Sequence, residues 1–336
     1  MPPDAVPPEI RAIADARSDA RRERDWATAD RLKGELEAAG WKVIDAASLY
    51  TLERAAPPDL EVGGSVRYGS TASVPSRLDD APAGVATVII VATDDVAGAI
   101  RQAEALADGS PDGTQVVIVA NAPSDEAGDA LAALDRLDAA GPGAPGVATE
   151  VVRTATRVGA AAAWNAGLRR AVSPVVVLLG PGIVAPASLV PAIVEAFEDP
   201  SVAVAGPVGL VSDNLRSFLA APSDAVDVDA IAGDAIGFRR EDAAARGLLD
   251  EHFVAPDHLA TWWSLVLRDP ADDEDEDAEP RRAVQVPVEL GHAGVPEADD
   301  DADPAQARLA KRNFYRFLKR FATRRDLVGS AARGDD

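Results

Sequence analysis

From residue 85 onward, short apolar runs alternate with longer segments in which apolar residues recur at helical spacing. The runs cover 85–93, 114–121, 149–154, 175–179 and 202–211, and the helical segments cover 96–107, 124–138, 158–172 and 187–198. A run that is apolar at nearly every position is typical of a strand covered on both faces. Alternation of such strands with helices predicts an α/β domain whose mainly parallel sheet is flanked by helices.

The first 84 residues follow a different pattern. Residues 9–39 have helical spacing, Gly40 suits the position just after a helix end, and a strand-like piece follows at 41–45. We therefore expect a helical hairpin with a short strand over 1–54, which is too small for a full globular core. Residues 55–84 are rich in Pro, Gly and Ser and lack periodicity, which predicts a flexible linker.

The C-terminal segment 305–328 is predicted to be a basic amphipathic helix. Phe314, Phe317, Leu318 and Phe321 fall at i, i+3, i+4 and i+7 and form one apolar stripe. The remaining positions carry the cations Lys311, Arg312, Arg316, Lys319, Arg320, Arg324 and Arg325. Three interpretations stay open: the stripe packs on the sheet, the helix contacts a membrane through 308–325, or its cations neutralise a bound diphosphate.

Composition narrows the function classes. The chain of 336 residues has a net charge of −23, so we expect no nucleic-acid partner. The lack of Cys excludes disulfides and thiolate chemistry, and the three scattered His do not have the spacing of a histidine metal site. With no signal-like N-terminus and no apolar run of about 20 residues, we expect a cytoplasmic protein, with peripheral contact at the inner membrane face left open.

Two acidic runs, 271–279 and 297–303, interrupt the last part of the domain. Their Asp spacing lacks the Gly and Glu of a calcium-binding loop, so they are interpreted as solvated loops. A strand-like piece, 282–290, lies between them, and the α/β domain is therefore expected to cover 85–304.

Residues 85–268 resemble family 2 glycosyltransferases, which have the GT-A fold. Four segments carry the resemblance in order: "VATVIIVATDD", "VVIVANAPSDEAGDAL", "RVGAAAAWNAGLRRAVSPVVVLLGPGIV" and "AGDAIGFRREDAAARGLLDEHF". The resemblance implies a nucleotide-sugar donor, an acceptor that the sequence does not identify, and a mixed, mainly parallel sheet.

The chain departs from that family at three functional positions. The two acids that hold a divalent ion in such enzymes fall at Gly180-Pro181-Gly182, whose side chains cannot ligate a metal, so neither a metal nor another cofactor is expected. The acid that contacts the base falls at Ala120, beside Asn121. The catalytic acid falls near 260–261, where Asp257 is the nearest acid.

The resemblance nominates candidate site residues. The donor side is expected to include Thr93, Asp94, Asp95, Asn121, Gly159, Asn165 and Gly180, and the acceptor or phosphate side Gly233, Arg239 and Trp262, with Asp257 as base. Several of them have a structural alternative. Asp94 and Asp95 would also suit a polar loop with a helix N-cap, and Asp257 would cap the helix that holds Trp262 and Trp263. That Trp pair would place one ring in the core and one at its edge, and Arg239 would be a surface charge.

The N-terminal segment "ARSDARRERDWATADRLKGELEAAGWKVIDA" resembles the C-terminal segment of cysteinyl-tRNA synthetases. The catalytic modules of that enzyme have no counterpart here, so aminoacylation is not implied. The segment is interpreted as a hairpin used for docking or oligomerisation, with tRNA contact as the alternative.

Two hypotheses of different class follow. The first is a family 2-like glycosyltransferase that uses a nucleotide sugar without a metal. The second is an inactive protein of the same fold that binds a ligand or a partner.

Overall fold

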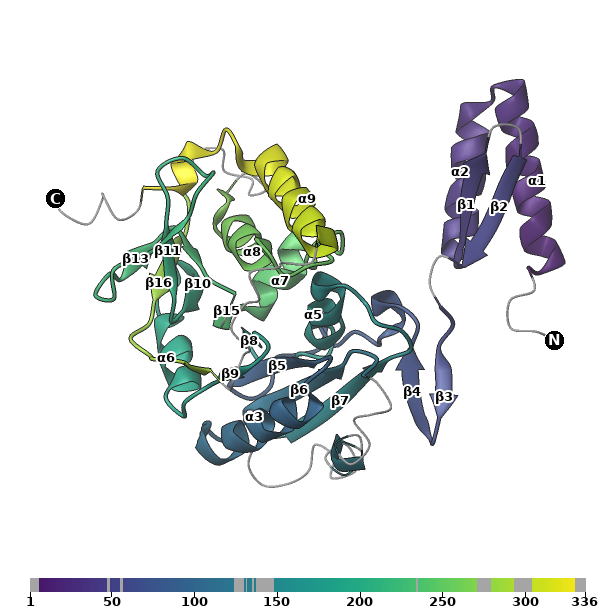
Figure 1. Cartoon of the computed structure of the whole chain (residues 1–336). Coiled ribbons are helices and arrows are strands. Elements are labelled where there is room, and N and C mark those ends of the chain that lie inside the picture. Colours follow the sequence, from purple (N-terminus) through teal and green to yellow (C-terminus); the bar gives the residue numbers. More distant parts are fainter. Residues whose placement is uncertain are drawn as a thin grey trace. The chain divides into compact units, whose positions relative to one another are not determined.

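The computed structural model describes residues 6–46, 49–54, 57–123, 130, 132–134, 136, 148–233, 235–270, 279–292 and 304–329 (Figure 1). The chain forms two compact units, Met1–Glu61 and Val62–Asp336. Most of the helix expected over 124–138, nearly all of the acidic run 271–279 and the whole of 297–303 lie outside the described residues.

The first unit is built from two helices and a β-hairpin. Its elements are α1 (Pro8–Glu23), α2 (Trp26–Ala38), β1 (Trp41–Ala46) and β2 (Leu49–Arg54). Gly40 has a φ of 77°, the left-handed conformation that ends a helix, as the sequence predicts. The sequence does not predict β2, which pairs antiparallel with β1.

A small core and one ion pair hold this unit together. Ile10, Ala14, Leu36 and Trp41 form the core. The buried Arg17 donates two hydrogen bonds of 2.9 Å to Asp45 on β1, and these bonds lower the pKa of Asp45. The helices and the hairpin are therefore joined by both apolar packing and a bidentate salt bridge.

The second unit is built on one large sheet. Among the described residues its strand order is β13-β16-β10-β15-β8-β5-β6-β7-β4-β3. The strands are β3 (Leu60–Val62), β4 (Ser65–Tyr68), β5 (Ala86–Ala92), β6 (Gln115–Ala120), β7 (Ala148–Thr154), β8 (Val175–Leu179), β10 (Val202–Gly206), β13 (Asp227–Val228), β15 (Ala235–Arg239) and β16 (Arg282–Gln285). The neighbours β8, β5, β6, β7 and β4 are parallel, whereas β15 runs antiparallel to both β8 and β10.

Helices cover both faces of this sheet (Figure 1). On one face, Ile89 of β5 and Leu178 of β8 share a core with α5 (Ala160–Leu168) and α8 (Leu259–Arg268). On the other, Ile90 and Leu179 share a core with α3 (Val96–Gly109) and α6 (Leu189–Ala196). Adjacent residues of one strand point to opposite faces, so an apolar run that is buried on both sides supplies both cores.

The remaining described elements are short, apart from the last helix. They are η1 (Thr71–Ser73), β9 (Ile183–Val184), β11 (Gly209–Val211), β12 (Leu219–Ala220), β14 (Ala230–Ile231), α7 (Arg240–Arg246), β17 (Gly291–His292), α9 (Pro304–Phe321) and η5 (Arg325–Leu327). β11, β12 and β14 form a separate small sheet, and β9 pairs with β17.

The segment expected to be a linker has regular structure where it is described. Within 57–84, β4 pairs with β7 through Arg67–Arg153 and Tyr68–Thr154, and the side chain of Thr71 is buried against α5. The strands here are too short and too polar for hydrophobic periodicity to indicate them, so composition alone suggested a linker.

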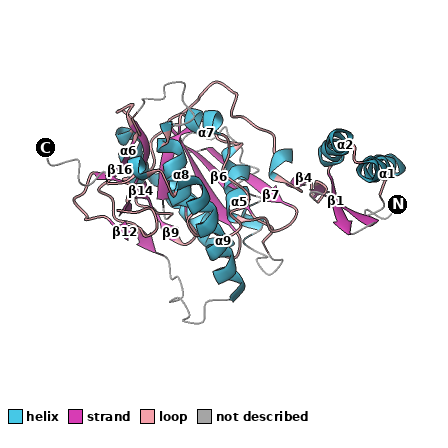
Figure 2. Cartoon of the chain, turned by 90° about the horizontal axis from the view of Figure 1, so that it is seen from above, coloured by secondary structure: helices cyan, strands magenta, loops and turns pink. Residues whose placement is uncertain are grey.

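The C-terminal helix α9 lies along α8 in both Figure 1 and Figure 2. Phe317 and Phe321 are buried, and Arg320 lies over the ring of Trp262 at 5.9 Å. Asn313 donates hydrogen bonds of 3.0 Å to the carbonyl oxygens of Ala255 and Asp257. The apolar stripe therefore packs against the domain, but on α8 and the loop before it rather than on the sheet.

Candidate functional site

The strand order creates a crevice between β5 and β8. From β5 the chain passes through α3 to β6 on one side, while β8 lies on the other side of β5 and is preceded by α5. The strand order thus reverses at β5, because the chain moves outward to β6 and β7 and then returns through α5, on the face opposite α3, to β8. Such switch points are where open α/β sheets bind ligands.

A cleft of about 970 Å³ occupies this place. Its described wall consists of Ile90, Val91, Thr93, Asp94, Asp95, Gly98, Ala99, Arg101, Gln102, Ala105, Asn121, Arg157, Val158, Gly159, Ala160, Ala163, Trp164, 181–185, 254–256, Gln306 and Leu309. The volume is that of a typical pocket for a small organic ligand.

The two acids after β5 both have structural partners. The Asp95 side chain accepts a 2.7 Å hydrogen bond from the backbone N–H of Gly98 and is the N-cap of α3, which confirms the capping alternative for this residue. Asp94 is exposed and forms an ion pair with Arg157, a residue from the loop before α5. The two loops at the mouth of the cleft are thus joined by opposite charges.

Asn121 fixes the next part of the wall. Its Oδ1 accepts a 2.8 Å hydrogen bond from the backbone N–H of Val158, and its Nδ2 donates a 3.0 Å bond to the carbonyl oxygen of the same residue. Thr154 donates a further bond to Oδ1, while Thr93 lies 3.5 Å from Nδ2. Asn121 is only 4% exposed, so its amide mainly holds the loop that carries Arg157.

The N-terminus of α5 is covered by another loop. The backbone N–H groups of Ala160 and Ala161 donate to the carbonyl oxygens of Val254 and Phe253, at 2.8 and 3.1 Å. A Cβ on Gly159 would lie 2.8 Å from the Cα of Val254, so only glycine allows this approach. These first helical donors are thus used within the protein and are not directed at a phosphate.

The turn after β8 carries no metal ligands. Pro181 is followed by Gly182 with a φ of 72°, the Pro-Gly pattern of a type II turn, and both residues line the cleft while Gly180 does not. Across the described residues, no group of three or more His, Cys, Asp or Glu side chains is placed to hold a metal ion.

Three predicted residues, Asn165, Arg239 and Trp262, are not part of the described cleft wall. Asn165 is buried and exchanges hydrogen bonds of 2.8 and 3.0 Å with the backbone of Leu249. Arg239 pairs with Val175 at the opposite end of β8, and its guanidinium donates to the carbonyl oxygens of 197, 199 and 202.

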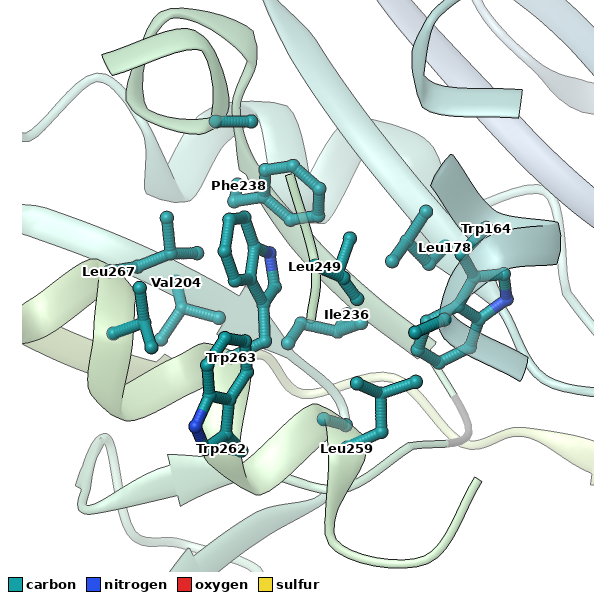
Figure 3. Close-up of a cluster of buried hydrophobic side chains, with 14 of the residues drawn as sticks. Trp164, Leu178, Val204, Ile236, Phe238, Leu249, Leu259, Trp262, Trp263 and Leu267 are labelled. Carbon is teal, nitrogen blue, oxygen red and sulfur yellow. The ribbon is translucent and has the colours of Figure 1, made fainter. Parts of the chain in front are cut away.

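Trp262 is part of the core shown in Figure 3. Its ring packs on Phe253 at 5.3 Å and stacks on Trp263 at 6.1 Å. Both Trp side chains are buried, at 6% and 1% exposed, which differs from the expected split between core and edge. The reason is that α9 covers the outer side of α8, as the contact of Arg320 with Trp262 shows.

Gly233 and Asp257 lie nearer the cleft without forming its described wall. β15 begins beside Leu179, so Gly233 is at the same edge of the sheet, where a Cβ added to it would lie 3.6 Å from the Cβ of Ala260. Asp257 follows Pro256, a wall residue, but its described bond is the one its carbonyl oxygen accepts from Asn313. The N-cap of α8 is His258 and not Asp257. Packing on Phe314 and Phe317 desolvates the His258 ring and lowers its pKa.

The sequence did not nominate Gln102, Arg157 or the wall residues from α9. Arg101 and Gln102 both lie on α3 about two turns after Asp95, so helical periodicity from the predicted cap would have placed them on the side of the helix that carries Gly98. No local signal indicates that Leu309 reaches the cleft, because its place depends on the packing of α9. The described residues contain no helix long and apolar enough to cross a membrane.

Comparisons with known proteins address the fold. No family model matches the chain. A crystal structure of GalNAc-T7 with UDP, GalNAc and Mn²⁺ matches with a TM-score of 0.50 at 14% identity, covering 70% of this chain and 48% of that protein. The fold is GT-A-like. A mannosyltransferase from Pyrobaculum calidifontis, in complex with GDP-Man and Mn²⁺, matches with a TM-score of 0.48 at 17% identity over 79% of each chain.

The match to GalNAc-T7 confirms the fold predicted from the sequence, and this chain spans about half the length of that protein. A cysteine–tRNA ligase of Opitutus terrae is 44% identical over 54 residues. That match covers 16% of this chain and 12% of the ligase, so it concerns a short segment and not the ligase as a whole.

Proposed function

We propose that the protein is a family 2-like glycosyltransferase that takes a nucleotide-sugar donor into the cleft without a metal ion. The observation that carries the proposal is the cleft itself, which lies at the switch point of a GT-A-like sheet and has a turn without carboxylates after β8. The resemblance of residues 85–268 to that family supports the donor class.

The diphosphate of such a donor needs positive charge. In the described wall the cations are Arg101 and Arg157, whereas α9 contributes only Gln306 and Leu309. Arg157 pairs with Asp94, and Arg101 lies 4.0 Å from Asp95. We therefore assign diphosphate binding to Arg157, assisted by Arg101, in place of the cations of α9 or Arg239. A guanidinium neutralises a phosphate through paired hydrogen bonds, and in transfer it would stabilise the leaving diphosphate.

Calorimetric titration tests this assignment. Wild-type protein is titrated with UDP, GDP, dTDP and their sugars, with and without Mn²⁺, and Arg157→Ala is titrated with the tightest ligand. We expect binding without metal and an affinity at least about tenfold lower in the variant, because a charged hydrogen-bonded pair is lost.

Arg77→Ala is the matched control, since Arg77 also forms a surface ion pair, with Asp80, but lies outside the described cleft wall. Its affinity is expected to equal that of the wild type. Absence of binding under every condition, or binding only with Mn²⁺, contradicts the proposal.

A second function, ligand binding without turnover, is favoured by the shortage of acids in the cleft. In the described wall the carboxylates are Asp94 and Asp95, which are engaged by Arg157 and by the cap of α3. Asp257 remains the proposed base. Donor hydrolysis measured for the wild type and for Asp257→Asn separates the two functions: loss of turnover in the variant supports transfer, while no turnover in the wild type supports the binding protein.

The remaining partner proposals concern the two ends of the chain. Contact of residues 308–325 with an anionic membrane surface would rest on exposed cations such as Lys311, Arg312 and Lys319, because Phe317 and Phe321 of the apolar stripe are buried. The first unit is proposed to act in docking or oligomerisation. Its exposed Trp26, with Arg21 over the ring at 5.8 Å, is one surface for such a contact.

A further inference from the structure

The segment 254–256, with the sequence Val-Ala-Pro, contributes an apolar part to the cleft wall. Its three carbonyl oxygens accept hydrogen bonds of 2.8, 3.0 and 3.0 Å, in chain order from the backbone N–H of Ala160, from the side chain of Asn313 and from the backbone N–H of Leu259. Because these acceptors are used within the protein and the side chains are apolar, the segment offers a ligand mainly apolar contacts.

Val254 is 49% exposed although its backbone is packed. Its carbonyl oxygen is bonded to Ala160, and a Cβ on Gly159 would lie 2.8 Å from its Cα. The accessible surface of Val254 therefore belongs largely to its isopropyl group.

Two other elements add aliphatic side chains to the same cleft. Val184 of β9 is 46% exposed, and its backbone pairs with Gly291 of β17. Leu309 of α9 is half-buried and also lines the cleft. We call Val184, Val254 and Leu309 the apolar patch. Accessible aliphatic side chains in a concave wall favour a ligand with an apolar group, because binding removes apolar surface from water.

A nucleotide-sugar donor does not account for the apolar patch. Its diphosphate is assigned to Arg157 and Arg101, and its sugar carries hydroxyl groups that need polar partners when they are buried. The position of the proposed base points to the acceptor instead. Asp257 directly follows the segment 254–256, so an acceptor hydroxyl at Asp257 is close to Val254.

We propose that the apolar patch is an acceptor subsite, and that the acceptor carries an apolar group beside the hydroxyl that receives the sugar. The inference rests on the proposed function, because it takes the cleft as the site of transfer and Asp257 as the base. It narrows the acceptor to an alcohol or glycoside with an aliphatic or aromatic group, in contrast to a free saccharide.

The transfer step is the same for any such acceptor. The acceptor oxygen forms a bond to the anomeric carbon of the sugar, and the bond from that carbon to the diphosphate breaks. Asp257 takes the proton of the acceptor hydroxyl, and the nucleoside diphosphate leaves with the electron pair. The apolar patch contributes by holding the acceptor, so its loss should weaken acceptor binding and leave donor binding unchanged.

The test replaces both exposed valines, as Val184→Ser/Val254→Ser, which removes their methyl groups without adding bulk. Wild type and variant are titrated calorimetrically with methyl β-D-glucoside, with n-octyl β-D-glucoside below its micelle-forming concentration, and with UDP, GDP and dTDP. We expect the wild type to bind octyl glucoside at least about tenfold more tightly than methyl glucoside, because burial of about two methylenes supplies that factor. The variant should lose about tenfold in affinity for octyl glucoside and keep its affinity for the nucleoside diphosphates.

Leu219→Ser/Val226→Ser is the matched control, since both residues are exposed aliphatic side chains outside the described cleft wall. Its affinities are expected to equal those of the wild type, and both double variants should keep the wild-type thermal midpoint. Equal affinity of Val184→Ser/Val254→Ser and wild type for octyl glucoside overturns the inference and leaves the proposed function standing. An equal loss in the control variant, or a loss of nucleoside diphosphate affinity, has the same meaning.

Neutral phosphatidylcholine vesicles separate an acceptor subsite from a membrane contact. We expect neither the wild type nor Val184→Ser/Val254→Ser to sediment with them. Sedimentation of the wild type that this variant lacks overturns the inference, because the apolar patch would then be a lipid-binding surface. If the wild type binds none of the three nucleoside diphosphates, the proposed function fails and the inference fails with it.

Discussion

At the scale of single residues, the polar groups around the cleft mostly serve the backbone. Asp95 caps α3, and Asn121 binds both backbone groups of Val158. These contacts fix the two loops that carry Asp94 and Arg157. The ion pair between these two residues is therefore positioned by the backbone hydrogen bonds of its loops as well as by its own attraction. Since both of its members are exposed, the pair itself contributes little to stability and is free to exchange for a ligand.

Gly159 and Gly34 allow a matched test of whether a position has room for a Cβ atom. Gly159→Ala is expected to lower the stability around α5 by about 1–3 kcal/mol, because its Cβ would meet the backbone of Val254 at 2.8 Å. Gly34→Ala, in the interior of α2 with no atom within 4 Å, is expected to raise helix stability by about 0.5–1 kcal/mol. Native-state hydrogen exchange of the amides in each helix measures both effects. An unchanged exchange rate in α5 of Gly159→Ala would show that the loop moves aside at no cost.

At the same scale, the sequence predicted part of the candidate site. Thr93, Asp94, Asp95, Asn121 and Gly159 all line the cleft, because they follow strand ends that a parallel sheet brings to one edge. Asn165, Arg239 and Trp262 lie elsewhere. A resemblance transfers positions along the chain but not the direction of each side chain, which the packing of α8, α9 and the strand pairing decide.

At the scale of elements, periodicity was a good guide wherever an element was long and buried. The run expected at 85–93 is β5 (Ala86–Ala92), and the run expected at 175–179 is β8 (Val175–Leu179). The strands that the sequence missed, such as β3 and β12, have two or three residues and exposed side chains. Their pairing partners stabilise them, and a hydrophobic pattern carries no information on partners.

Helix α9 depends on its buried aromatic stripe. Phe317 is 1% exposed and meets Phe218 edge-to-face at 5.8 Å, so Phe317→Ala is expected to cost about 3–5 kcal/mol of unfolding free energy in the second unit. Tyr315→Ala is the control, because Tyr315 is 59% exposed and its loss should stay within about 0.5 kcal/mol. Urea unfolding followed by tryptophan fluorescence reports the transition, since Trp262 lies beneath Arg320 of α9. Equal losses in the two variants would mean that α9 is not docked through this stripe.

At the scale of the whole molecule, charge is the dominant feature. With a net charge of −23, the excess acidic side chains repel one another in the folded protein, and salt weakens this repulsion by screening it. Raising the ionic strength from about 0.01 M to about 0.1 M shortens the screening length from about 30 Å to about 10 Å. We therefore expect the thermal midpoint to rise by about 2 °C or more, equally with NaCl and KCl. A falling midpoint would mean that ion pairs such as Arg17–Asp45 outweigh the net repulsion.

The turn after β8 also limits which substitutions could create a cation site in this protein. Supplying two carboxylates at 180 and 182 would not by itself recreate a cation site, since residue 182 has a φ of 72° and Pro181 has a locked backbone. An Asp at 182 would sit in a conformation that costs an L-residue about 1–2 kcal/mol, and the turn would have to be remodelled before either acid became useful. A metal site at this turn would therefore require a different backbone conformation as well as new side chains.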